Sequence, residues 1–270
     1  MDETLPRIGL GTYSDDDAAQ WTKNVRSALE AGYRHVDTAE VYGNEEYVGE
    51  GIAASDVDRE DVFLATKSVH EEKPGPTRED VIAGVEGSLD RLGTDYVDLL
   101  YVHWPADLYD PETTLGAFEE LREGGAVRNV GVSNFEPDQL DRAREVLDGP
   151  LFAHQVEMHP LLQQEHLQEY AARHDHWLVA YCPIARGRVY DVPVIREIAE
   201  ECDATPAQVS LAWLLSKENV AAVPKAATPA HQRENLAALD LALDDGQVAR
   251  IDALEREHRI IDRDYAPWNR

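Results

Sequence analysis

Four polar residues whose chemistry could move a proton each follow an apolar segment that is typical of a β-strand. The segments are HVDTAEVYG (35–43) with Asp37 and Tyr42, VFLATKS (62–68) with Lys67, and DLLYVHWP (98–105) with His103. In a β/α barrel the carboxyl ends of the parallel strands share one face, where the chemistry is done. We therefore expect a carboxylate, a phenol, an ammonium and an imidazole to meet in one cleft.

Matching of pKa values assigns roles to these groups. A free tyrosine has a pKa near 10, and we expect the Lys67 ammonium to lower the pKa of Tyr42 while Asp37 keeps the lysine charged. Tyr42 would then donate a proton, and a neutral His103 would orient a carbonyl oxygen beside it. A hydride donor would approach the opposite side of that carbon. No serine or cysteine nucleophile with an adjacent base is found, which argues against acyl transfer.

Taken singly, each of the four residues has an ordinary structural explanation. Asp37 could cap a helix, Tyr42 could be a half-buried loop aromatic, Lys67 could face water, and His103 could be a core histidine. Stability does not require aliphatic strands to end three times in titratable groups on one rim. The joint pattern therefore favours a catalytic site.

The composition is that of a folded domain in a reducing environment. With 270 residues, 43% of them hydrophobic, and no Pro/Gly/Ser linker, the chain predicts one domain spanning residues 1–270. No apolar run approaches the roughly 20 residues of a membrane helix, and the N-terminus does not resemble a signal peptide, so we expect a cytoplasmic protein with no membrane partner. Cys182 and Cys202 have no metal-ligand spacing, so we expect no metal.

The charge is strongly and diffusely acidic. The net charge is −28, from 53 acidic and 25 basic side chains, and the acidic residues are spread along the chain. Such a surface repels nucleic acid, so we expect none as a partner. We interpret it as a solvated surface adapted to very high salt, typical of a halophile. A docking face for a cationic partner is the alternative.

Strand-like and helix-like segments alternate through the whole chain. The strand-like segments are 7–13, 35–39, 62–68, 96–103, 129–134, 152–160, 177–184 and 220–226, and the helix-like ones are 25–33, 45–55, 78–93, 113–127, 138–148, 166–175, 194–218 and 231–239. Eight such units predict a closed (β/α)₈ TIM barrel. An open dinucleotide-binding sheet is disfavoured, because the segment 9–13, GLGTY, lacks the third glycine of its fingerprint. No long exposed apolar stripe is present, so we expect a monomer.

Several motifs, in order along the chain, give it a resemblance to the aldo-keto reductases. They are GLGTY, HVDTAEVYGNE, TKS, LGTDYVDLLYVHWP, GVSNF, QVEMHP, AYCPIARG and VPKAATPAHQREN. The resemblance implies a (β/α)₈ barrel that binds a nicotinamide cofactor without a Rossmann fold. It also implies that Asp37, Tyr42, Lys67 and His103 form a catalytic tetrad with Tyr42 as the proton donor.

The resemblance implies cofactor contacts as well. Ser133, Asn134 and Gln155 would bind the nicotinamide carboxamide, and Tyr181 would stack on the nicotinamide ring. The loop from Pro183 to Gly187 would follow the pyrophosphate, with charge from Arg186 or Arg188. The remaining cofactor residues implied by the resemblance are Gly11, Thr12, Lys225, Thr228, His231, Glu234 and Asn235.

The segment VPKAATPAHQREN departs from the family pattern for gripping a ribose 2′-phosphate. Ala226 and His231 stand where the family has a serine and an arginine, although Lys225 and Thr228 remain. An imidazole with a pKa of about 6.5 is a poor replacement for a permanently charged guanidinium fork. We therefore expect NADPH and/or NADH as cofactor, with NADH used at least as well. Arg233 lies about 200° around the helix from His231 and does not substitute for it.

The expected substrate is a small or medium carbonyl compound in a fairly open pocket. Tyr13, Trp104 and Trp268 are the expected walls, with Val69 near the cofactor, and the segments after strands four and seven and the C-terminal tail are expected to be short. The expected reaction is reversible reduction of an aldehyde or ketone. The alternatives are a slow nicotinamide-binding regulatory or sensor subunit, and an aldolase-like enzyme that forms a Schiff base on Lys67.

Overall fold

The computed structural model describes residues 5–13, 17–69, 76–106, 109–255 and 257–270. Its centre is an eight-stranded parallel sheet in which every strand neighbours the next one along the chain. The strands are β1 (Leu10–Gly11), β2 (His35–Asp37), β3 (Phe63–Ser68), β4 (Val97–Val102), β5 (Val127–Ser133), β6 (Ala153–Glu157), β7 (Trp177–Tyr181) and β8 (Val220–Ala222). The predicted (β/α)₈ fold is confirmed, whereas the boundary at residues 1–270 stays a prediction.

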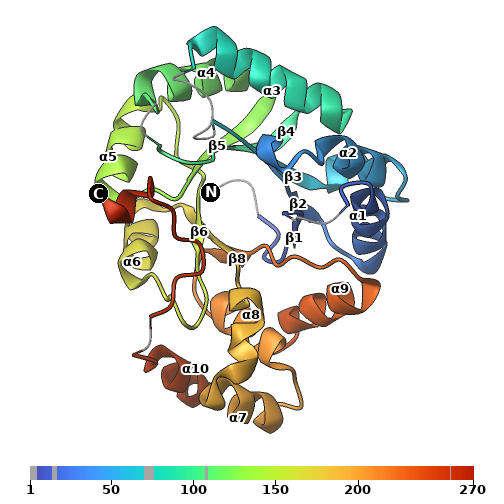
Figure 1. Cartoon of the computed structure of the whole chain (residues 1–270), viewed down its shortest axis with the longest axis vertical. Helices are drawn as coiled ribbons and strands as arrows, with labels where there is room; N and C mark the ends of the chain where they lie inside the picture. Colours follow the sequence, from blue (N-terminus) through green and yellow to red (C-terminus); the bar gives the residue numbers. More distant parts are fainter. Residues whose placement is uncertain (1–4, 14–16, 70–75, 107–108, 256) are drawn as a thin grey trace.

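The first strand lies beside the last one. Ile8 forms a parallel bridge with Ala222, Gly11 forms one with Lys225, and the Gly9 amide donates to the Ala222 carbonyl at 2.8 Å. Gly11 allows this approach, because a Cβ at that position would lie 2.5 Å from the Val223 carbonyl oxygen. The sheet therefore curls round on itself, with the helices outside it (Figure 1).

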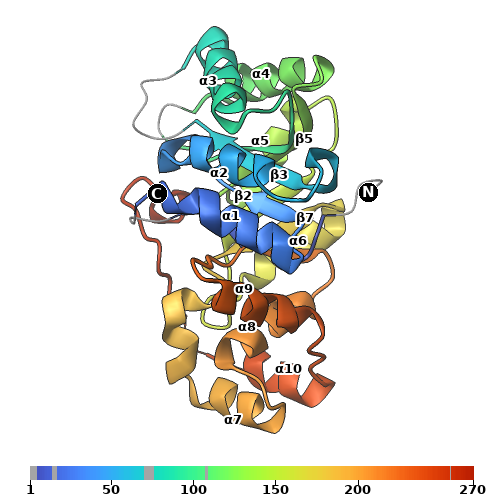
Figure 2. The ribbon, with the colours of Figure 1, turned by 90° about the vertical axis from the view of Figure 1, so that its right-hand side faces the viewer.

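Helices connect the strands and cover their outer faces. They are α1 (Gln20–Ala31), α2 (Glu45–Ala53), α3 (Arg78–Leu92), α4 (Pro111–Glu123), α5 (Pro137–Val146), α6 (Glu165–His174), α7 (Pro193–Glu201), α8 (Pro206–Leu215), α9 (Pro229–Leu236) and α10 (Asp245–Asp252). Short 3₁₀ turns add η1 (Glu40–Tyr42), η2 (Arg59–Asp61), η3 (Ala185–Asp191), η4 (Ala237–Leu239) and η5 (Pro267–Asn269). Figure 2 shows α7, α8 and α10 grouped at one end of the molecule.

Two helix predictions were wrong. The segment 194–218 is not one helix, because Asp203 takes a left-handed φ of 51° and Thr205 then begins α8 with a capping box to Gln208. Pro206 occupies the first turn, where its missing N–H has no cost. The segment 231–239 is not the last helix either, since α10 follows it with its own capping box between Asp244 and Gln247.

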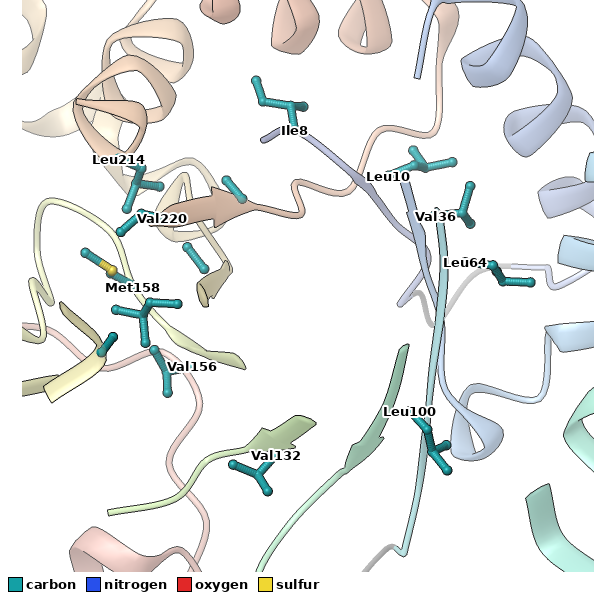
Figure 3. Close-up of a cluster of buried hydrophobic side chains, with 14 of the residues drawn as sticks. Ile8, Leu10, Val36, Leu64, Leu100, Val132, Val156, Met158, Leu214 and Val220 are labelled. Carbon is teal, nitrogen blue, oxygen red and sulfur yellow. The ribbon is translucent and has the colours of Figure 1, made fainter. Parts of the chain in front are cut away.

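Alternation along the strands divides their side chains between two cores. Residues one apart point to opposite faces of a sheet, so Leu64 and Leu100 lie in the outer cluster between sheet and helices, which Figure 3 shows in close-up. Ala65, Leu99 and Tyr101 belong to a separate inner cluster. Lys67 is two positions after Ala65, and His103 is two positions after Tyr101, so both side chains point to the same inner face. Both residues lie at the carboxyl ends of their strands. The inward pattern therefore delivers them to the mouth of the barrel.

The C-terminal tail, residues 253–270, returns to the barrel after α10. Figure 1 shows it passing α6 and ending beside α5. Tyr265 and Trp268 pack against Trp104, with ring centroids 5.4 and 5.7 Å apart. The expectation of a short tail was therefore wrong. In the described ranges, no helix is both long enough and apolar enough to cross a bilayer.

Candidate active site

A buried ion pair lies beneath the mouth of the barrel. Lys67 Nζ on β3 lies 2.5 Å from Asp37 Oδ1 on the neighbouring strand β2, and it also donates to the Thr38 carbonyl at 2.7 Å. The Nε2 amide of Gln155 donates to the second carboxylate oxygen, Oδ2, at 2.8 Å. Burial lowers the pKa of Lys67, and the charge of Asp37 opposes that effect. The pair therefore keeps an ammonium in place where water is excluded.

Tyr42 lies above this pair at the end of η1. Lys67 Nζ is 5.2 Å from the centroid of its ring, and the His103 ring meets it edge to face at 5.8 Å. Tyr13 contacts the same ring at 5.2 Å. The structure thus brings the four predicted residues together, although they come from three β/α units.

The prediction for the pKa of Tyr42 was wrong in direction. Burial raises the pKa of the Tyr42 phenol well above 10, and the Asp37 carboxylate adds to the increase. The sequence indicated both the Lys67 ammonium and the Asp37 carboxylate that holds it, but not that burial would dominate the pKa of the phenol. Tyr42 is therefore protonated at neutral pH and carries the proton that a general acid needs.

A chain of hydrogen bonds joins the ends of β4, β5 and β7. The Asn134 side chain donates to the His103 carbonyl at 3.1 Å and to Ser133 Oγ at 3.0 Å, and its Oδ1 accepts from the Tyr181 hydroxyl at 2.8 Å. Asn134 itself has a left-handed φ of 65°, which asparagine tolerates better than most residues. These contacts fix amide and hydroxyl groups and one aromatic ring at the mouth.

A cleft of about 670 Å³ opens over these groups, which is within the range of small-molecule sites. Its predicted lining residues are Gly11, Thr12, Tyr13, Asp37, Tyr42, His103, Trp104, Ser133, Asn134, Gln155, Tyr181, Pro183, Arg186 and Lys225. Ile184, within the predicted Pro183–Gly187 loop, also lines the cleft. Sequence reasoning did not single out Val41, Cys182, Val223, Ile261, Arg263 and Tyr265. The first three adjoin or closely precede predicted residues, whereas the last three belong to the tail and had no local signal.

Other predicted residues lie outside the lining of the cleft. On α9, Thr228 caps the helix by accepting from the His231 amide, His231 is exposed, and Asn235 is buried. Glu234 accepts from the Tyr190 hydroxyl at 3.4 Å. The lining of the cleft also does not include the predicted residues Lys67, Val69, Arg188 and Trp268. Of these, Lys67 holds the cleft residue Asp37, and the Trp268 ring packs against Trp104 with the centroids 5.7 Å apart.

The residues around the cleft fit a nicotinamide cofactor. Ser133, Asn134 and Gln155 offer amide and hydroxyl groups, and Tyr181 offers an aromatic ring. Thr12 Oγ1 is buried without a hydrogen-bond partner in the described part of the chain, so it has a donor to offer. Arg186 and Lys225 supply positive charge for phosphates. No group of three metal-ligating side chains occurs in the described ranges.

Comparison with known proteins gives one consistent result. The sequence model of the Aldo/keto reductase family matches residues 7–256. A glyoxal reductase from Bacillus subtilis (strain 168) is 36% identical over 257 residues, covering 95% of this chain and 91% of that protein. The structure of a protein assigned as 2,5-diketo-D-gluconic acid reductase B superimposes with a TM-score of 0.92 at 38% identity, covering 97% of this chain and 92% of the other. For MGS-M4, an aldo-keto reductase from a deep-sea metagenome library, the TM-score is 0.90 at 33% identity, with 97% and 95% covered.

Proposed function

The chain belongs to the aldo/keto reductase family, and on this premise we propose that it reduces aldehydes or ketones to alcohols with a nicotinamide cofactor. The observation that carries the proposal is the position of the Tyr42 ring, whose centroid lies 5.2 Å from Lys67 Nζ, above the buried Lys67–Asp37 pair. Glyoxal and diketogluconic acid, which name two of the similar proteins, are small carbonyl compounds. They support a substrate of that kind for this chain.

Each member of the tetrad has a distinct role in this proposal. Tyr42 donates its proton to the carbonyl oxygen, and the Lys67 ammonium stabilises the phenolate that remains. Asp37 and the Thr38 carbonyl fix the ammonium beneath the ring. His103, whose ring contacts the edge of Tyr42, hydrogen-bonds the substrate oxygen and sets its direction. The cofactor, when bound, supplies the hydride for the carbonyl carbon.

Different residues of the cleft bind the nicotinamide and the phosphates of the cofactor. Ser133, Asn134 and Gln155 bind the carboxamide of the nicotinamide, and Tyr181 packs on the ring. Arg186 and Lys225 bind the phosphates. The α9 residues lie beyond the cleft, where the adenosine end would extend, and His231 is exposed there. With no serine hydroxyl and no arginine fork at this end, NADH is used at least as well as NADPH.

The state of Lys67 argues against the Schiff-base alternative. Its side chain is only 1% exposed, and its ammonium donates to Asp37 and to the Thr38 carbonyl, so no free amine faces the cleft. Nucleophilic attack needs a neutral, accessible amine. A slow sensor would keep the cofactor site without efficient proton transfer, whereas here the proton donor is in place.

A panel of carbonyl compounds, followed through cofactor absorbance with NADH and NADPH in parallel, tests the proposal. We expect substrate-dependent oxidation of the reduced cofactor, and retention of its labelled hydride in the alcohol. Borohydride treatment with substrate but without cofactor is the control for the alternative chemistry. A covalent adduct on Lys67 together with no hydride transfer would reject the proposal.

A further inference from the structure

The cleft reverses the charge balance of the chain. The whole sequence has 53 acidic and 25 basic side chains, yet the lining of the cleft has three basic residues, Arg186, Lys225 and Arg263, and one acidic residue, Asp37. Asp37 is neutralised by Lys67 at 2.5 Å. The mouth of the barrel is therefore cationic on a strongly acidic protein, which favours anionic ligands.

The three cations are on two different sides of the cleft. Lys225 follows β8 and forms a parallel bridge with Gly11 of β1, and Arg186 follows β7. Arg263 belongs to the tail, whose Tyr265 ring packs on Trp104, the residue after His103. The first two cations thus flank the expected phosphates, whereas Arg263 is on the side of the residues expected to hold the carbonyl substrate.

The tail that carries Arg263 is attached to the barrel by a buried carboxylate. Glu157, at the end of β6 and only 1% exposed, accepts the backbone amides of Ile260 at 2.5 Å and Ile261 at 2.7 Å. Because the Leu161 amide donates to His159 Nδ1, the histidine proton is on Nε2, which donates to Glu157 at 3.0 Å. The backbone just before Arg263 is therefore fixed at the mouth.

The Arg263 guanidinium has no ion-pair or hydrogen-bond partner in the described part of the chain, although acidic residues flank it in sequence. Asp262 Oδ1 accepts from Trp268 Nε1 at 3.1 Å and from the Asn269 side chain at 2.7 Å. Asp264 does not line the cleft. An arginine at a cleft without an internal carboxylate partner offers a planar fork that fits a carboxylate in two parallel hydrogen bonds.

We propose that Arg263 binds a carboxylate of the substrate, so that the preferred substrates are carbonyl compounds that also carry a carboxylate. This inference rests on the proposed function and makes its substrate class specific. The carbonyl lies at Tyr42 and His103, and the carboxylate extends past Trp104 to the tail. Neutral aldehydes occupy the same position at the tetrad but lack the second anchor.

Matched pairs of substrates test the proposal. We would compare succinic semialdehyde with its methyl ester, and 4-carboxybenzaldehyde with its methyl ester, at one fixed salt concentration. A bidentate charged contact is worth about ten- to a hundred-fold in affinity, so we expect kcat/KM to favour the acids by that factor. Arg263→Gln removes the preference by raising KM for the acids, while the esters are reduced as before. Arg263→Lys keeps part of the preference.

The matched control is Arg250→Gln on α10, which removes one positive charge from a surface site where Arg250 pairs with Glu197 and Glu201. It should leave the preference for acids unchanged. If the wild type reduces esters as well as acids, or if Arg263→Gln keeps the full preference, the carboxylate role of Arg263 is overturned while carbonyl reduction stands. If no compound of either kind is reduced with either cofactor, the proposed function fails and this inference fails with it.

Discussion

Lys67 Nζ and Asp37 Oδ1 lie 2.5 Å apart on adjacent strands, and both side chains are almost fully buried. Each of these two buried charges stabilises the other, because removing one leaves the other unpaired and lowers the free energy of unfolding by about 3–5 kcal/mol. Substitution of Lys67 would therefore mix a loss of chemistry with a loss of stability. Tyr42, which is half-buried and forms no part of the pair, allows a cleaner test.

Tyr42→Phe should lower kcat for carbonyl reduction by about a hundred- to ten-thousand-fold, since general acid catalysis contributes that much. The substitution removes one hydroxyl and keeps the ring contacts with Tyr13 and His103. Steady-state kinetics gives kcat, and titration of intrinsic fluorescence gives the cofactor Kd, which should stay within a few-fold of wild type. Near-normal turnover by the folded variant would remove Tyr42 from the mechanism.

The raised pKa of Tyr42 predicts opposite pH profiles for the two reaction directions. The acid form of a group predominates below its pKa, so kcat/KM for reduction should stay level through neutral pH and decline only above the ordinary tyrosine value of about 10. Alcohol oxidation needs the phenolate and should rise with pH. A decline in reduction between about pH 7 and 9 would show instead that Lys67 lowers this pKa in the working enzyme.

His231→Arg should shift cofactor preference toward NADPH by about ten- to a hundred-fold, the usual worth of a bidentate charged contact. His231 is exposed on the first turn of α9, where Thr228 caps the helix. The measurement is kcat/KM with both cofactors. His166→Arg, at an exposed position on α6, adds the same charge elsewhere and should change nothing. A wild-type preference for NADPH above about a hundred-fold would show that other residues already bind the 2′-phosphate.

Glu157→Gln should loosen the tail. An amide loses the charge of the carboxylate that accepts from Ile260, Ile261 and His159. We expect a higher KM for carbonyl substrates, little change in cofactor affinity, and faster trypsin cleavage after Arg263, followed by mass spectrometry. Glu86→Gln, at an exposed site on α3, is the control. Unchanged KM and unchanged cleavage would mean that the tail is held by its aromatic contacts alone.

The dispersed charge of −28 predicts that salt stabilises the fold. The Debye length shortens from about 10 Å at 0.1 M to about 3 Å at 1 M, so repulsion between acidic neighbours weakens as salt increases. The melting temperature should rise as potassium chloride increases from dilute to multimolar. Sucrose, which carries no charge, controls for general exclusion of solutes from the surface. A flat or falling melting temperature would refute adaptation to high salt.

Local pattern was sufficient to predict the barrel and the meeting of Asp37, Tyr42, Lys67 and His103 at its mouth. Strand and helix periodicities are properties of residues that are close together in the sequence. Because inward-facing positions recur every second residue along a strand, Lys67 and His103 could be placed on the inner face at the carboxyl ends of their strands. The break between α7 and α8 also had a local signal, the Thr205–Pro206 pair, which was outweighed by the apolar periodicity on either side.

Three features depended on contacts between distant residues. The tail reaches the cleft because Glu157 accepts amides that are more than a hundred positions away, and a sequence gives no direct sign of such a partner. The pKa of Tyr42 depends on burial and on the Asp37 carboxylate nearby, which only the packed structure sets. Arg263 becomes a cleft residue only once the tail is folded back. The sequence by itself determined which groups the strands deliver to the mouth of the barrel, because that follows from local periodicity. The tertiary structure decided how those groups are charged and what covers them, because desolvation and long-range hydrogen bonds arise only when distant segments pack together.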